Sequence, residues 1–342
     1  MEGTNNSTIK SHRKKAYLKW FKRALLALVT LILAVAIFIK ADAPAAAYLA
    51  DHVLRPLIGD RAVIFFEDVF FSILDTTDSL VYKFKQPEAP QFLDQDGDNN
   101  IASTLNLTAI PVSNNFNSLK NEGVWHDLAS TIFPGKEVMA TTFVRPDPNR
   151  SFAIVSLVQI DTKLLGLDAV AGTKEPGGTL GNPGSGVIPQ NVLDSNTLVA
   201  GFNGGFLYSD GKYGMIVGDK TYVPLETGAG TIAAYTDGSV KIFNYTGDNL
   251  GKNLIFARQN SQLIVENGQV TLTPESSVKM RGRVLHGGIF TWRSGIGITK
   301  TGNLLYAAGN NLSPMTLAIA LQMAGAENAI PLDINPSQVH FY

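Results

Sequence analysis

The stretch that decides the fold is FTWRSGIGITKTGNLLYAAGNNLSPMTLAIALQMAGAENAIPLD, residues 290–333. Within it, residues 295–299 and 304–308 have strand composition, and the Thr-Gly-Asn sequence between them favours a tight turn. This pattern predicts a β-hairpin.

A helix is predicted after the hairpin. Ser313 is a natural N-cap, and the proline that follows suits the first helical position, because its missing N–H would have no partner there. Apolar residues continue at helical spacing, and residues 329–332 then form a short apolar strand that ends at Asp333. Since open sheets place ligand sites at such strand ends, we expect this unit to hold Arg293 and Asp333 beside one cleft.

Composition bounds the class of protein. The chain has 342 residues, of which 45% are hydrophobic, so it can bury a core of one domain of about 200 residues. It has no Cys, which excludes disulfides, thiolate metal sites and a Cys nucleophile. Its charge is uneven, because residues 1–23 contain seven Lys or Arg against one Glu, while the remainder is acidic. Nothing in this pattern indicates a nucleic-acid-binding face.

An apolar run of sixteen residues, 24–39, predicts one transmembrane helix over residues 20–40. The run alone spans about 24 Å, and the flanking aromatic residues and Lys40 extend it toward the bilayer thickness. The basic tail of residues 1–19 indicates a cytoplasmic N-terminus, with the C-terminal domain outside the cell membrane. The alternative is a cleaved signal peptide and a secreted protein, since Ala41-Asp-Ala43 has the form of a cleavage site.

Three further regions follow the predicted anchor. Residues 41–85 are apolar and aromatic with helical spacing, which suits an amphipathic juxtamembrane region, although a helix packed on the domain would have the same pattern. Residues 86–120 are rich in Asn, Asp, Ser and Pro and are predicted to be a polar linker. Residues 121–342 are predicted to form the domain.

The domain reads as a succession of short strands separated by Gly, Asn, Asp and Pro. Asp237-Gly238 and Asn267-Gly268 each mark a hairpin, and residues 198–202 form an apolar strand. Because the helix from Ser313 is the one strong helical pattern here, the predicted class is α+β, with mixed or antiparallel sheets and few helices.

Several kinds of catalytic or cofactor site are excluded. No Ser lies in a Gly-x-Ser-x-Gly pattern, so a nucleophile elbow is absent. The glycine-rich residues 181–186 lack the Lys-Ser/Thr of a phosphate loop. The five His residues have no metal-ligand spacing. We therefore expect neither a metal nor a cofactor.

One polar motif remains after these exclusions. Asn203-Gly204-Gly205-Phe206 follows the predicted strand 198–202. Glycines at this place let the backbone approach a ligand, and an Asn amide can both donate and accept hydrogen bonds. A turn with Asn in a left-handed conformation would have the same sequence.

Taken in order, these elements resemble the phosphodiester glycosidase family. The resemblance covers residues 124–333 and rests on five short motifs: Asn203-Gly-Gly-Phe206, the hairpin at Asn267-Gly268, Arg293-Ser294-Gly-Ile-Gly297, the helix from Ser313, and Leu332-Asp333. Residues 145–147 and 172–178 are similar to those of an exported, membrane-anchored bacterial branch. The chain departs from the family after Asp333, where Ile334-Asn-Pro336 replaces a glycine- and serine-rich run.

The resemblance implies a hydrolase that cleaves the bond between the anomeric carbon of a sugar and a phosphodiester, with a carbohydrate phosphodiester as substrate. Asp333 would be a catalytic carboxylate, Arg293 would hold the departing phosphate, and Asn203 would orient a sugar or phosphate oxygen. Candidate substrate-binding residues are Gly204, Gly205, Ser294, Asp210, Glu226 and His286. The altered run after Asp333 leaves an alternative open, a non-catalytic envelope module that binds glycan or phosphopolymer. The sequence does not indicate an oligomeric state.

Overall fold

The structure of the protein is a computed structural model. It describes residues 85–90, 107–128, 136–195, 197–273, 290–334 and 338–342, together with Ala102, Ser103, Leu105 and scattered residues between 20 and 82. The chain divides into two compact units, Met1–Leu74 and Asp75–Tyr342. In the first unit, the described residues include the short helix α3 (Arg55–Ile58).

No helix in the described part of the chain is long and apolar enough to cross a membrane. Most of the predicted transmembrane segment, residues 20–40, and most of the juxtamembrane region lie outside the described residues. Both therefore stay predictions.

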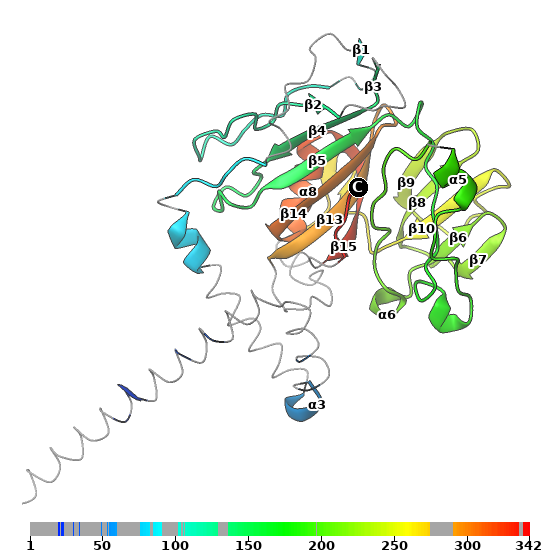
Figure 1. The fold of residues 1–342 in the computed structure, drawn as a ribbon, viewed down its shortest axis with the longest axis horizontal. Coiled ribbons are helices and arrows are strands. Elements are labelled where there is room, and N and C mark those ends of the chain that lie inside the picture. The colour runs from blue at the N-terminus through cyan, green and yellow to red at the C-terminus, as the bar shows by residue number, and fades with distance from the viewer. Residues whose placement is uncertain are drawn as a thin grey trace, which may run out of the picture. The chain divides into compact units, whose positions relative to one another are not determined.

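The second unit is built on an eight-stranded antiparallel sheet with the order β12-β11-β15-β13-β14-β5-β4-β2 (Figure 1). Its strands are β2 (His126–Asp127), β4 (Met139–Val144), β5 (Val155–Ile160), β11 (Val265–Glu266), β12 (Gln269–Val270), β13 (Thr291–Thr299), β14 (Leu304–Leu312) and β15 (Ala326–Ile334). The predicted hairpin is thus confirmed as β13 and β14, and both strands are longer than the sequence indicated.

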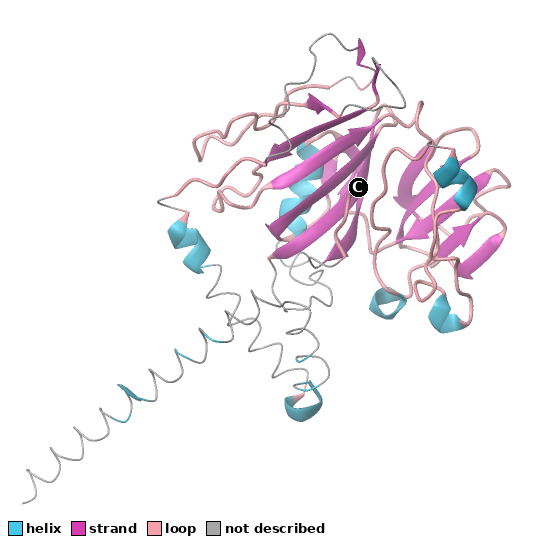
Figure 2. Ribbon diagram, viewed as in Figure 1, coloured by secondary structure: helices cyan, strands magenta, loops and turns pink. Residues whose placement is uncertain are grey.

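A second antiparallel sheet has the order β7-β6-β10-β8-β9. Its strands are β6 (Met215–Val217), β7 (Lys220–Val223), β8 (Gly230–Tyr235), β9 (Val240–Asn244) and β10 (Leu254–Gln259). Smaller elements are a parallel pair, β1 (Ala102–Ser103) and β3 (Lys136–Glu137), and the short helices η3 (Gly178–Leu180), α5 (Gln190–Asp194) and α6 (Tyr208–Gly211). Figure 2 shows strands dominating this unit, which confirms an α+β class with few helices.

The turn chemistry decides where the hairpins fall. Asn267 and Gly268 have φ of 50° and 72°, the pair of positive values that a two-residue hairpin turn requires. They connect β11 and β12 as predicted. Gly238, with φ of 83°, likewise lies between β8 and β9. The predicted strand 198–202 is wrong, because Phe202 forms only an isolated bridge with Phe341.

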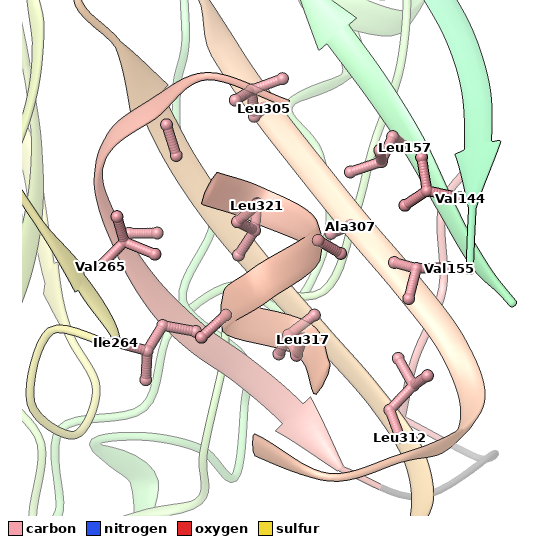
Figure 3. Close-up of a cluster of buried hydrophobic side chains, with 14 of the residues drawn as sticks. Val144, Val155, Leu157, Ile264, Val265, Leu305, Ala307, Leu312, Leu317 and Leu321 are labelled. Carbon is pink, nitrogen blue, oxygen red and sulfur yellow. The ribbon is translucent and has the colours of Figure 1, made fainter. Parts of the chain in front are cut away.

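Helix α8 (Pro314–Met323) begins as predicted, since the Ser313 hydroxyl accepts a hydrogen bond from the Thr316 N–H at 3.0 Å. The chain then turns at Gly325, whose φ of 89° is left-handed. Leu317 and Leu321 of α8 lie in a buried cluster with residues of β5 and β14 (Figure 3). A Cβ at Gly295 of β13 would lie 3.1 Å from each leucine, so glycine lets the helix pack closely on the sheet.

A second buried cluster joins the two sheets. It includes Ile232 and Phe256 from the five-stranded sheet and Ile296, Tyr306 and Ile330 from the eight-stranded sheet. The eight-stranded sheet therefore has α8 against one face and the smaller sheet against the other, and both faces are apolar.

Part of the stretch predicted as a linker packs on the domain. Leu105 and Ile110 are buried, and the carbonyl oxygen of Leu105 accepts a hydrogen bond from Gln159 at 2.9 Å. Nearby, the Arg145 guanidinium and the Glu122 carboxylate form a buried ion pair at 2.6 Å. Paired in this way, the two charges avoid the large cost of isolated burial.

Candidate functional site

Asp333 lies one residue before the end of β15, beside a β-bulge. Arg293 pairs with Ile334 and Gly295 pairs with Pro331, so β15 has one more residue than β13 across this step. The Ser294 hydroxyl fills the bulge: it accepts from the Asp333 N–H and donates to the Asp333 carbonyl, each at 3.2 Å. The bulge thus fixes the backbone that carries the Asp333 carboxylate.

The Asn203 side chain bonds directly to this carboxylate. Its Nδ2 donates to Oδ2 of Asp333 and to the hydroxyl of Ser294, both at 3.0 Å. Its Oδ1 accepts from the Tyr306 hydroxyl at 2.9 Å and from the His340 N–H at 3.2 Å. An amide offers two donor hydrogens and two acceptor positions, and all four are used here. The sequence analysis expected this amide to orient a substrate oxygen. In the structure, its hydrogen-bonding groups are instead occupied by Asp333, Ser294, Tyr306 and His340.

The two oxygens of Asp333 differ in their surroundings. Oδ2 also accepts from the Gly205 N–H at 3.2 Å, whereas no described group donates to Oδ1. Burial raises the pKa of Asp333 to about 6, although the bonds from Asn203 and Gly205 and the positive charge of Arg258 oppose the shift. One oxygen is held by the protein and the other is left for a ligand.

Arg258, at the end of β10, is the cation whose charge acts on Asp333, and the sequence analysis missed it. Its guanidinium is buried and donates to the carbonyl oxygens of Gly204, Phe206, Tyr213 and Gly214. Burial lowers its pKa to about 10, which still leaves it charged at neutral pH. It thus fixes the loop after Asn203 and adds a positive field near the carboxylate.

The two residues after Arg258 hold the loop that follows Asn203 and the loop before β8. Gln259 accepts from the N–H groups of Gly214 and Glu226, and it donates to the Glu226 carbonyl. Asn260 accepts from the Phe206 N–H at 3.0 Å. Three consecutive polar side chains buried at a strand end are unusual, and Arg-Gln-Asn at 258–260 was the sequence signal that could have found them.

The two predicted glycines play different parts. Gly205 has φ of 109°, and a Cβ there would overlap the amide of Asn260, so this position requires glycine. Gly204 is exposed, and a Cβ there would meet no atom within 4 Å. Gly205 is therefore needed for the backbone conformation of the loop. Gly204 leaves the solvent-exposed side of the loop backbone uncovered.

The other two predicted acidic residues differ in their effect on Asp333. Asp210, in α6, is close enough for its charge to raise the pKa of Asp333. Glu226 is exposed in the loop before β8, and its backbone is held by Gln259. His286 lies outside the described residues. Asp210 is thus the described acid whose charge acts on Asp333.

Arg293 lies on the strand next to Asp333, opposite Ile334, and its charge is not among those that act on the pKa of Asp333. Successive side chains of a strand point to opposite faces, so Arg293 lies on the α8 side of the sheet and Ser294 on the side of Asn203. The Arg293 Nε donates to the Leu312 carbonyl at 2.8 Å, and burial lowers its pKa to about 9. Its predicted contact with a departing phosphate remains a prediction.

Residues 340–342 also contribute to the site, although no sequence motif indicated them. The Asn203 N–H donates to the His340 carbonyl at 3.3 Å, and the Tyr306 hydroxyl lies 3.1 Å from the same oxygen, so its single proton is shared between this carbonyl and the Asn203 amide. Gly201 and Tyr342 exchange two backbone hydrogen bonds, at 3.2 and 2.9 Å. This short antiparallel pairing supports Asn203 from the side opposite Asp333.

Within the described ranges, no group of three or more His, Asp or Glu side chains could hold a metal ion. The described site thus consists of a buried carboxylate, a second carboxyl group, amides and a buried guanidinium. Such a set can stabilise or attack a positively charged carbon and can move protons.

Comparison with known proteins places this site in a family. A model of the phosphodiester glycosidase family matches residues 196–333, which include Asn203, Arg258 and Asp333. No curated protein sequence matches the chain.

Among solved structures, the catalytic domain of zebrafish N-acetylglucosamine-1-phosphodiester alpha-N-acetylglucosaminidase, auto-inhibited by its pro-peptide, is 14% identical with a TM-score of 0.43, over 64% of this chain and 77% of that one. A hypothetical Synechocystis protein is 13% identical with a TM-score of 0.37, over 61% and 58%. A Burkholderia pseudomallei putative exported protein is 11% identical with a TM-score of 0.25, over 56% and 69%. On the family match, residues 196–333, which carry Asn203 and Asp333, are those of a phosphodiester glycosidase domain.

Proposed function

We propose that the protein hydrolyses sugar-1-phosphodiesters, cleaving the bond between the anomeric carbon and the phosphate oxygen. The observation that carries this proposal is the Asp333 carboxyl group, which is buried, has a pKa of about 6, and has Oδ2 held while no described group donates to Oδ1. A phosphodiester glycosidase domain fits this arrangement.

In the proposed reaction, Asp333 acts on the anomeric carbon. As the bond to the phosphate oxygen breaks, that carbon gains positive charge, and an ionised carboxylate stabilises it. With a pKa of about 6, most Asp333 is ionised at neutral pH. Asn203 and Gly205 aim the reacting oxygen because they bind only the other one. Water then supplies the hydroxyl of the released sugar, and a phosphomonoester leaves.

Asp210 is the candidate second carboxyl group. Glycosidases commonly use two carboxyl groups, and Asp210 is the described acid whose charge raises the pKa of Asp333. Since a phosphate is already a good leaving group, we assign Asp210 to handling the attacking water rather than to protonating the departing oxygen. Gly204, which is exposed and open, lies where a substrate can approach the backbone.

The test uses the full chain and a chromogenic sugar-1-phosphodiester, with release of free sugar as the readout. Asp333→Asn keeps the shape and both hydrogen bonds but removes the charge, so turnover should fall by at least about a thousandfold. Asp219→Asn is the matched control, because it makes the same change at an exposed carboxylate whose charge is not among those acting on Asp333. Equal turnover of wild type and Asp333→Asn would contradict the proposal.

A second candidate is a non-catalytic module that binds envelope glycan or phosphopolymer. It is favoured by Ile334 and Pro336, which stand where the family has glycines, because glycine N–H groups could surround an anion and Pro has no N–H. In the same experiment, this candidate predicts binding of the phosphodiester with no release of sugar, by wild type and by Asp333→Asn alike.

We also propose that residues 20–40 anchor the chain in the cell membrane and that the domain lies outside, where envelope or extracellular glycans would be its substrates. The support is the apolar run with its basic tail. Secretion after cleavage near residues 41–43 is the alternative.

A further inference from the structure

The segment 340–342 is fixed firmly beside the site. Its backbone pairs with residues 201–203, and the Phe341 ring packs against Phe202 at 6.2 Å and Tyr306 at 5.1 Å between ring centroids. Phe341 thus points toward the apolar cluster between the two sheets. The segment is held by hydrogen bonds on one edge and by aromatic packing on one face.

Strand alternation places the rings on either side of Phe341 on the opposite face. His340 and Tyr342 are both exposed, and the Tyr342 side chain is 80% exposed. Their rings are nearly parallel, with 13° between planes and 5.7 Å between centroids. In this pairing Asn203 lies opposite His340 and Gly201 lies opposite Tyr342, so these residues share one face.

The neighbourhood of Tyr342 is open. A Cβ at Gly201, its cross-strand partner, would meet no atom within 4 Å. A substituted residue at position 201 would stand beside the Tyr342 ring, because directly opposed side chains are close neighbours. Glycine therefore leaves space next to an exposed aromatic face.

The backbone of His340, which carries one of these rings, is one amide group from the carboxylate. The same Asn203 side chain accepts from the His340 N–H and donates to Asp333. A sugar with its anomeric carbon at Asp333 would therefore have any linked second unit within reach of these rings. An aromatic ring offers a flat apolar face with a polar edge, which suits the apolar C–H face of a pyranose and its hydroxyl groups.

We propose that His340 and Tyr342 form a subsite for a second sugar ring of the substrate. The proposal rests on the proposed function, because it places this ring next to one reacting at Asp333. The subsite would recognise a neutral pyranose, since aromatic faces rather than charged side chains form it. It would make the enzyme prefer substrates with at least two sugar units.

The first test measures binding and does not depend on turnover. Saturation-transfer NMR is recorded with the full chain and cellobiose, maltose or N,N′-diacetylchitobiose. At least one disaccharide should receive saturation from the wild type. The signal should fall at least about threefold in Tyr342→Ala and return in Tyr342→Phe, because the phenyl ring retains the stacking face. Val187→Ala is the control, since Val187 is an exposed apolar side chain.

The second test measures turnover of two substrates, N-acetylglucosamine 1-(methyl phosphate) and the chitobiose analogue. Tyr342→Ala should lower the preference for the two-sugar substrate about five- to tenfold, through KM, as expected for loss of one aromatic contact. His340→Ala, which keeps the backbone N–H to Asn203, should act in the same direction.

Three results would overturn the subsite. In the first, the wild type gives no disaccharide signal. In the second, wild type and Tyr342→Ala give equal signals. In the third, Tyr342→Ala is active and its substrate preference is unchanged. A shift from dimer to monomer in Tyr342→Ala by analytical ultracentrifugation, with disaccharide signals unchanged, would show that the rings bind another copy of the chain. If the wild type turns over neither substrate, the proposed function fails, and the NMR experiment still decides the subsite.

Discussion

Asn203 and Asp333 are 130 residues apart in the chain, and a hydrogen bond of 3.0 Å joins the amide of one to the carboxylate of the other. The amide donates to the ionised form, so this bond lowers the pKa that burial has raised. Burial therefore raises the pKa of Asp333, and a loop residue partly offsets the rise, with its amide oriented in turn by Tyr306 and the backbone of His340.

The first prediction concerns this bond. Asn203→Ala removes a donor to the ionised form, so the pKa of Asp333 should rise from about 6. The acid limb of the pH profile of kcat/KM should move to higher pH by roughly half to one unit, as expected for loss of one hydrogen bond to a carboxylate. Asn249→Ala, in a distant exposed loop, is the control. An unmoved acid limb in a folded Asn203→Ala would show that the bond does not tune Asp333.

The second prediction concerns stability and pH. The pKa of Asp333 in the folded protein, about 6, is above its ordinary value of 3.8, so folding favours the protonated form. The stability from Asp333 is present in full below pH 3.8 and is lost as pH rises through 6. Asp333→Asn removes this loss while its amide oxygen can still accept both hydrogen bonds. The variant should be more stable than wild type at pH 7–8, by on the order of 1–3 kcal/mol.

The measurement is denaturant unfolding of both proteins between pH 4 and pH 8. The advantage of Asp333→Asn should grow with pH across this range and be near zero at the acid end. Glu226→Gln should show no such trend, because Glu226 is exposed. An advantage for Asp333→Asn that is constant with pH would mean that the carboxylate is not destabilised by burial.

Local patterns predicted the central part of the fold. Turn residues and the Ser313 cap depend on neighbours in sequence, and the hairpin β13–β14, helix α8 and the final strand appear as expected. Asn203 and Asp333 were named from sequence motifs, and the structure joins them by a hydrogen bond, although Asn203 follows no strand and Asp333 lies within β15.

The remainder of the site depends on relations that a local pattern does not contain. The face on which Arg293 lies follows from its strand position relative to Ser294, and the bulge at Asp333 appears only once β13 and β15 are paired. Arg258 acts through carbonyl groups about 50 residues earlier in the chain. Tyr306 lies within the predicted strand 304–308, but its hydroxyl contact with Asn203 joins residues that are 103 positions apart in the chain.

The third prediction compares neighbouring glycines. Gly205→Ala would force a side chain into the Asn260 amide at a φ of 109°, so it should lower the free energy of unfolding by roughly 2–4 kcal/mol. Gly204→Ala meets no atom within 4 Å and should cost less than about 0.5 kcal/mol. Thermal or denaturant unfolding of the two variants checks the difference. Similar losses for both would show that Gly205 is not constrained by Asn260.

The fourth prediction concerns topology. If residues 20–40 anchor the chain with its N-terminus in the cytoplasm, protease added to intact cells should remove the domain and leave residues 1–40 in the membrane. The readout is immunoblotting with tags at the two ends, with a cytoplasmic protein as the control for cell integrity. Recovery of a soluble mature protein that begins near Asp42 would contradict the anchor and support a cleaved signal peptide.

The last prediction separates two buried arginines. Arg258 lowers the pKa of Asp333 by its charge, whereas Arg293 is not among the groups that act on it. Arg258→Met should therefore move the acid limb of kcat/KM to higher pH, and Arg258→Lys, which keeps a positive charge, should move it less. Both changes also lose bonds to the carbonyl groups of the loop, so turnover should fall in each.

Arg293→Lys is the comparison. Its main expected effect is on folding, because a buried Nε that bonds to the Leu312 carbonyl at 2.8 Å is lost, at a cost of roughly 1–3 kcal/mol. Its acid limb should stay where the wild type has it. Turnover is measured with two substrates that share one sugar, a phosphodiester and an aryl glycoside without phosphate. If Arg293→Lys keeps the stability of wild type but loses turnover of the phosphodiester alone, Arg293 holds the departing phosphate after all, and the assignment of the cation near Asp333 to Arg258 is incomplete.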